Sequence, residues 1–162
     1  MALSAFCPHV SLRYSSLRYN NLRSNSAGPA LLRYSRILVT KARLLIAVVD
    51  DEEPIRKALM RLMRSAGLGV ETFASGAEFL KSIETRLPDC VVLDLQMPQM
   101  NGFNVQASLA QKCAALPVII VTGHDFPKAR ERALEGGASA FLRKPVHDRT
   151  LLDAISAATA AR

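Results

Sequence analysis

The segment that decides the fold reads LLIAVVDD and spans residues 44–51. An unbroken run of six aliphatic residues, half of them β-branched, is typical of a strand buried on both faces in a parallel sheet. The run ends at two carboxylates, Asp50 and Asp51. Because ligands of open α/β sheets bind outside the carboxyl ends of the strands, this segment predicts both the kind of sheet and the edge where its chemistry lies.

Three later segments repeat the arrangement of an apolar run followed by a polar residue. They are residues 90–93 before Asp94, residues 118–121 before Thr122, and residues 140–142 shortly before Lys144. A short alternating segment at residues 70–73 predicts a further strand of edge character, and the stretches between the strands have helical periodicity. Strands that alternate with helices in this way predict an α/β fold, (βα)5, with a doubly wound parallel sheet and right-handed crossovers.

Helix-start signals support this division of the chain. Pro54, directly after Asp51, Glu52 and Glu53, suits the first turn of the first helix. Ser75 with Glu78 predicts a capping box for the second helix. Residues 103–113 predict the third helix, Pro127 the start of the fourth, and Asp148 the cap of the fifth.

The positive charge of the chain is concentrated at its amino terminus. The formal net charge is +7, yet residues 1–43 contain seven Lys and Arg and no acid, which leaves residues 44–162 with 14 of each sign. We therefore expect a basic, disordered extension over residues 1–43 and one globular domain over residues 44–162. The extension can alternatively be a targeting segment or an arm that contacts an anionic surface. Because the globular domain has no net charge, we expect it not to bind nucleic acid directly.

The cysteines and the hydropathy indicate the cellular compartment in which the protein is expected. Cys7, Cys90 and Cys113 are too few and too irregularly spaced for a disulfide framework or a zinc site, which favours a reducing interior. No apolar stretch has the length of a membrane-spanning helix. We expect a cytoplasmic protein that makes no membrane contact.

The acidic residues at the strand ends predict a metal site. Asp50, Asp51 and Asp94 would repel one another unless one of them is protonated or a cation lies among them. Oxygen ligands with room for water and a phosphate favour Mg²⁺. Lys144 adds a compact positive charge and Thr122 a hydroxyl, so the set suits a phosphoryl transfer in which Asp94, which follows the predicted strand at residues 90–93, is the nucleophile.

These residues occur in a pattern that resembles the receiver domain of two-component response regulators. The matching pieces are VVDDE at residues 48–52, LDLQMPQMNG at residues 93–102, VTGH at residues 121–124 and RKP at residues 143–145. Residues 122–138 are especially similar to the branch of nitrogen-fixation-type regulators. The resemblance implies a CheY-like, flavodoxin-like fold with strand order 2-1-3-4-5.

The resemblance also implies a role for each site residue. Asp94 would accept the phosphoryl group, and Mg²⁺ would contact Asp51, Asp94 and the Gln96 carbonyl, with Asp50 acting mainly through water. Thr122, Lys144 and the amides of Gln96 and Gly123 would bind the phosphate. Thr122 and Phe141 would form a switch, and Pro145 would follow a cis peptide bond.

The implied function is that of a single-domain response regulator rather than an enzyme. A sensor histidine kinase or a histidine phosphotransfer protein would donate the phosphate. An unknown downstream protein would bind the face formed by the fourth helix, fifth strand and fifth helix, and the domain would be a monomer or a phosphorylation-dependent dimer. Two alternatives are a Mg²⁺-dependent aspartyl-phosphate phosphohydrolase, disfavoured because Gln96 replaces the second acid of an Asp-x-Asp pair, and a receiver-like interaction module that takes no phosphate.

Overall fold

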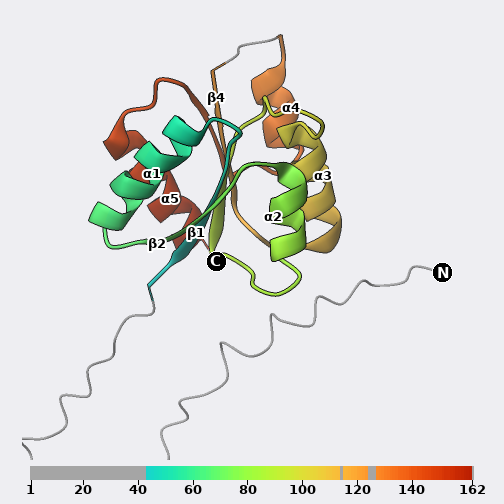
Figure 1. Cartoon of the computed structure of the whole chain (residues 1–162). Coiled ribbons are helices and arrows are strands. Elements are labelled where there is room, and N and C mark those ends of the chain that lie inside the picture. Colours follow the sequence, from blue (N-terminus) through green and yellow to red (C-terminus); the bar gives the residue numbers. More distant parts are fainter. Residues whose placement is uncertain (1–42, 114, 124–126, 162) are drawn as a thin grey trace, which may run out of the picture. The chain divides into compact units, whose positions relative to one another are not determined.

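The computed structural model describes residues 43–113, 115–123 and 127–161. Its centre is a sheet of five parallel strands in the order β2-β1-β3-β4-β5, which confirms the predicted fold (Figure 1). The strands are β1 (Leu45–Val49), β2 (Gly69–Phe73), β3 (Cys90–Leu93), β4 (Val118–Thr122) and β5 (Ala140–Arg143). The predicted extension of residues 1–43 lies, apart from Arg43, outside the described residues.

Helices cover both faces of the sheet (Figure 1). They are α1 (Glu53–Ser65), α2 (Gly76–Ser82), α3 (Gly102–Lys112), α4 (Ala129–Glu135) and α5 (Asp148–Ala160). Alternate residues of β1 point to opposite faces. Ile46 and Val48 pack in the cluster that contains residues of α1 and α5, whereas Ala47 and Val49 pack in the cluster that contains residues of α2, α3 and α4. Among these helices, none is long and apolar enough to span a bilayer.

The central strands are buried on both faces, as the apolar run of residues 44–49 predicts. Every residue of β3 and β4 is buried, and only Leu45 of β1 is partly exposed. Because the interior residues of these strands are buried, the charged groups of this part of the sheet lie beyond the strand ends, and the polar Thr122 is the last residue of β4. This places the polar residues that follow the strands at one edge.

Two predicted helix starts are displaced in the structure. The prediction that α4 begins at Pro127 is wrong, because Lys128 has φ 64° and a left-handed residue cannot continue a right-handed helix. The prediction that Asp148 caps α5 is also wrong by one residue: His147 is the cap residue, and Asp148 lies in the first turn, where its charge favours the helix amino terminus.

The predicted capping box of α2 is largely confirmed. The Ser75 hydroxyl accepts a hydrogen bond from the Glu78 amide at 3.2 Å. The Glu78 carboxylate accepts one in return, at 3.0 Å, from the Ala74 amide, one residue earlier than in the standard box. At α3, Asn101 caps the helix by accepting from the Asn104 amide at 3.0 Å.

Gly102 fixes the distance between the start of α3 and the end of β3. A Cβ at this position would lie 2.3 Å from the Asp94 carbonyl oxygen and 2.9 Å from the Leu95 Cα. Both neighbours are backbone atoms and cannot rotate away. Glycine is therefore required here by close approach, and the same approach holds the backbone of Asp94 in place.

We expect Gly102→Ala to lower the free energy of unfolding by about 1–3 kcal/mol, the usual cost of overpacking. Urea denaturation measures this loss. Gly69→Ala is the control, since its Cβ would meet nothing closer than 3.3 Å and should cost less. Equal stability of the two variants would contradict the close-approach argument.

Candidate functional site

The structure brings Asp50, Asp51 and Asp94 together at the carboxyl edge of the sheet. Asp50 and Asp51 follow β1, Asp94 follows β3, and the register pairs Val49 with Leu93 directly before them. Each of the three carboxylates has an oxygen within 4.8 Å of an oxygen of the other two. Asp50 and Asp94 are buried, whereas Asp51 is exposed. The three acids therefore form a half-buried cluster that is open to solvent on one side.

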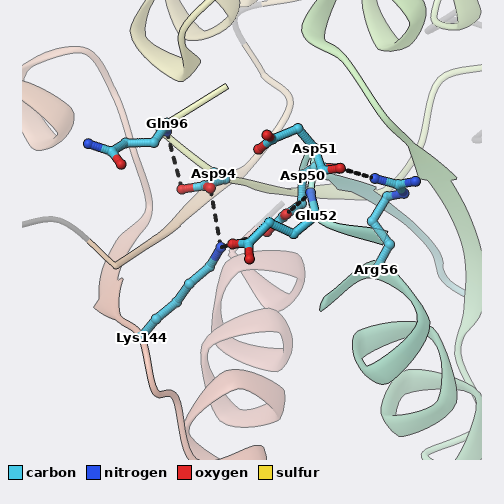
Figure 2. A network of polar contacts seen from close by, with 7 residues as sticks. All are labelled: Asp50, Asp51, Glu52, Arg56, Asp94, Gln96 and Lys144. Carbon is cyan, nitrogen blue, oxygen red and sulfur yellow. Dashed lines mark hydrogen bonds and ion pairs between the residues drawn. The ribbon is translucent and has the colours of Figure 1, made fainter. Parts of the chain in front are cut away.

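Lys144 reaches into this cluster from the end of β5 (Figure 2). Its Nζ lies 2.7 Å from Asp50 Oδ2 and 3.2 Å from Asp94 Oδ2. The Glu52 carboxylate lies 3.6 Å from the same nitrogen. A single ammonium thus neutralises part of a four-carboxylate cluster. Glu52 is not predicted as a site residue from the sequence, because an acid beside a helix start is equally well explained by the helix dipole.

The three aspartates differ in the hydrogen bonds that they accept. Asp50 Oδ1 accepts from the Glu52 amide at 2.8 Å, so both of its oxygens have a donor within the protein. Asp94 accepts from Lys144 and, at 3.3 Å, from the Gln96 amide. The side chain of Asp51 has no such donor among the described residues. Asp51 is consequently the carboxylate most available to a metal ion.

Burial dominates the electrostatics of Asp94 and raises its pKa above the ordinary value of 3.8. Nearby Asp50 also raises the pKa of Asp94, whereas the Lys144 charge and the Gln96 amide act in the opposite direction. The pKa of Lys144 is raised as well: its burial acts to lower it, but the hydrogen bond and charge of Asp50, and then Asp94, outweigh that. The Lys144 ammonium therefore stays charged, and it compensates only part of the negative charge of the neighbouring carboxylates.

The remaining predicted site residues lie at or close to this edge. Thr122 is fully buried at the end of β4, and its carbonyl accepts from the Lys144 amide at 2.9 Å. Gly123 lies against the Lys144 side chain, because a Cβ there would be 3.9 Å from Lys144 Cβ and Cδ. Phe141 is buried in β5 and pairs with Ile120 of the neighbouring strand. The Lys144–Pro145 peptide bond is cis.

The site opens into a cavity of about 560 Å³ on the side of the β3–α3 loop. Its wall includes polar groups of Asp51, Gln96 and Asn101. Arg132 of α4 also lines it, with its guanidinium carbon 4.2 Å from the centre of the Phe103 ring. Gln96, whose side chain is exposed, lines this cavity, and its backbone N–H donates to Asp94 Oδ1 at 3.3 Å (Figure 2). Solvent and a reactant group consequently have access to the acid cluster from this side.

A sequence model described as the response regulator receiver domain matches residues 46–156. The chain belongs to this family. The receiver domain is 42% identical over 120 residues to Nodulation protein W of Bradyrhizobium diazoefficiens, covering 74% of this chain and 52% of that protein. It is 39% identical over 115 residues to the response regulator protein TodT of Pseudomonas putida, covering 70% and 50% of the two chains. The chain spans about half the length of these curated relatives.

A solved structure has the same fold. A response regulator receiver protein from Burkholderia phymatum is 41% identical, with a TM-score of 0.66 over 73% of this chain and 96% of that chain. The suspected family and the CheY-like fold are therefore confirmed.

The residues of this receiver domain fit a divalent metal. Three carboxylate oxygens of different residues lie within 4.8 Å of one another, and hard oxygen donors of this kind select Mg²⁺ or Ca²⁺. Asp51 is exposed and its side chain accepts no hydrogen bond from the described residues, while Asp94 is held as a buried carboxylate whose charge is only partly compensated. A cation bound here would supply the compensation that Lys144 alone does not.

We expect Asp94→Asn to stabilise the metal-free domain at neutral pH. Because the pKa of Asp94 is raised by folding, the folded state loses stability as the pH rises from the ordinary value of 3.8 through the raised pKa, and the loss remains above it. Below pH 3.8 the carboxyl is protonated in both states, so the advantage of asparagine should disappear.

Chemical denaturation in EDTA at several pH values measures this difference. Asp153→Asn serves as the control, since Asp153 is exposed and its ion pair with Arg149 spans 3.8 Å. A variant at Asp94 that is no more stable than the wild type at pH 7 would show that Lys144 compensates the buried charge completely.

Proposed function

We propose that Asp94 of this receiver domain accepts a phosphoryl group from a phosphohistidine of a partner protein, either a sensor histidine kinase or a histidine phosphotransfer protein. The observation that carries the proposal is the convergence of Asp94 with two further aspartates and Lys144 at one sheet edge. A structural ion pair would need one acid and one base. An excess of buried, partly compensated carboxylate instead suits a site that gains a cation and then an anionic phosphoryl group.

The transfer forms a bond between an Asp94 carboxylate oxygen and phosphorus, and it breaks the bond between phosphorus and the histidine nitrogen. The electron pair of the broken bond remains on that imidazole nitrogen. Lys144, 3.2 Å from Asp94, is placed to pair with a phosphoryl oxygen, and the Gln96 and Gly123 amides are candidate donors to the others. Mg²⁺ held by Asp51, Asp94 and the Gln96 carbonyl, with Asp50 nearby, would neutralise the remaining phosphoryl charge.

We also propose that the phosphate is read out through Thr122 and Phe141. Both are buried on neighbouring strands, Thr122 as the last residue of β4 and Phe141 as the second residue of β5, and Thr122 pairs with Arg143, two residues beyond Phe141. A phosphoryl group on Asp94 adds negatively charged oxygens, and the Thr122 hydroxyl can donate a hydrogen bond to one of them. A bias of about 1–3 kcal/mol between two packings changes partner affinity roughly 5- to 150-fold.

The face formed by α4, β5 and α5 is the proposed output surface. Leu134 of α4 has 42% of its surface exposed, which is unusual for a large apolar side chain in the described part of this domain. The resemblance implies a separate downstream protein and a monomer or phosphorylation-dependent dimer, and both stay predictions. The cytoplasmic location expected from the cysteines and the hydropathy also stays a prediction. We propose a phosphoacceptor signalling domain rather than an enzyme that turns over a separate substrate.

Incubation with acetyl phosphate and Mg²⁺, followed by intact mass measurement, tests the acceptor. We expect a phosphate-sized mass gain that disappears in Asp94→Ala and without Mg²⁺. Asp153→Ala, an exposed aspartate of α5, is the control and should gain the same mass as the wild type. A gain that persists in Asp94→Ala would contradict the assignment of Asp94.

For the switch, we expect Thr122→Ala to accept phosphate but to lose the response that follows it. NMR of Phe141, recorded with and without a beryllofluoride phosphate mimic, reports the packing of the ring directly. In the wild type the Phe141 signals should shift on addition of the mimic, and in Thr122→Ala the shift should shrink at least several-fold. Equal shifts in both proteins would exclude the hydroxyl as the link.

A further inference from the structure

The turn that carries Asp50 and Asp51 is held by an arginine, Arg56, that no sequence motif singles out. Arg56 lies in the first turns of α1 and is half-buried. Its Nη1 donates to the Asp50 carbonyl at 2.7 Å and to the Asp51 carbonyl at 2.8 Å (Figure 2). One side chain therefore bonds the backbone of both acidic residues.

Both carbonyls lie between β1 and α1, where neither element supplies a regular partner. The carbonyl of Glu52 is the first to accept from α1, through the Arg56 amide at 3.0 Å. The carbonyls of Asp50 and Asp51 precede it. Hydrogen bonds from a charged donor are about twice as strong as neutral ones, so Arg56 is a strong tie for two otherwise unsupported peptide groups.

The orientation of these peptide groups decides where the carboxylates point. With both carbonyls bonded to one nitrogen, rotation of the turn between Val49 and Glu53 is restricted. The Asp50 carboxylate is additionally bonded to the Glu52 amide and Lys144, whereas the exposed Asp51 side chain has no such support among the described residues. The position of the Asp51 carboxylate thus depends mainly on its backbone.

We propose that Arg56 is a positioning residue that holds the Asp50–Asp51 turn in the geometry that Mg²⁺ requires, and so makes the site selective for Mg²⁺ over larger ions. The inference rests on the proposed function in taking a divalent cation as the ligand of the acid cluster. Mg²⁺ demands near-ideal octahedral geometry at short distances, whereas Ca²⁺ accepts longer and more variable ones. A loosened turn therefore penalises Mg²⁺ more than Ca²⁺.

The charge of Arg56 has the opposite effect on affinity from its hydrogen bonds. A positive charge near the cluster repels any divalent cation, so its removal alone would strengthen the binding of Mg²⁺ and Ca²⁺ alike. Loss of the two hydrogen bonds would weaken Mg²⁺ binding selectively. The sign of the change and its dependence on the ion distinguish the two effects.

Isothermal titration of the metal-free full chain with Mg²⁺ and, separately, with Ca²⁺ tests the proposal. Removal of a residue that orients metal ligands typically costs about 10- to 100-fold in metal affinity. We expect Arg56→Ala to raise the Kd for Mg²⁺ by about 10-fold or more, with a clearly smaller change for Ca²⁺. Arg56→Lys, which keeps a charged donor, should lie between this variant and the wild type.

Arg61→Ala is the matched control, because Arg61 is an exposed arginine of the same helix that forms no ion pair within the described part of the chain. It should bind both ions as the wild type does. Equal or tighter Mg²⁺ binding by Arg56→Ala, or an equal loss for both ions, would overturn the positioning role while leaving the proposed function intact. A wild-type chain that takes up no Mg²⁺ would overturn both.

Discussion

The dominant physical constraint on this domain is the electrostatic repulsion among the carboxylates that the parallel sheet brings together at one edge. Asp50, Asp51 and Asp94 are brought within 4.8 Å of one another by their places after two adjacent strands. The Lys144 ammonium, 2.7 Å from Asp50 and 3.2 Å from Asp94, offsets part of this repulsion. Burial still raises the pKa of Asp94, so the fold keeps an unmet demand for positive charge at the place where the proposed chemistry occurs.

The hydrophobic core and the site are two consequences of the same topology. Strands β1, β3 and β4 are buried on both faces by helices, which leaves their ends as the places where polar groups can lie. Gly102 lets the start of α3 approach the Asp94 backbone, and Arg56 ties the first turns of α1 to the backbone of Asp50 and Asp51. Helix starts therefore determine how precisely the site is built, while strands determine where it is.

Much of the candidate site was predictable because its residues directly follow apolar runs. The pattern of short runs ending at Asp50, Asp94 and Thr122 is strictly local, and the convergence of these residues follows from parallel pairing. Glu52 and Arg56 were not predictable in the same way. An acid before a helix and an arginine on a helix surface are common, and only their distances to Lys144 and to the Asp50 and Asp51 carbonyls distinguish them.

The amino-acid sequence alone was enough to predict the α/β class, the number and places of the strands, the edge that carries the polar residues and, through ordered motifs, the family. Tertiary structure decided which acid is exposed, which pKa values are raised, and where α4 begins, since Lys128 takes a left-handed conformation that no helical pattern signals. The physical reason is the separation along the chain of the residues that interact. Strand and helix patterns depend on residues that are neighbours in the sequence. Burial, charge compensation and a shared hydrogen-bond donor depend on residues that only the folded chain brings together.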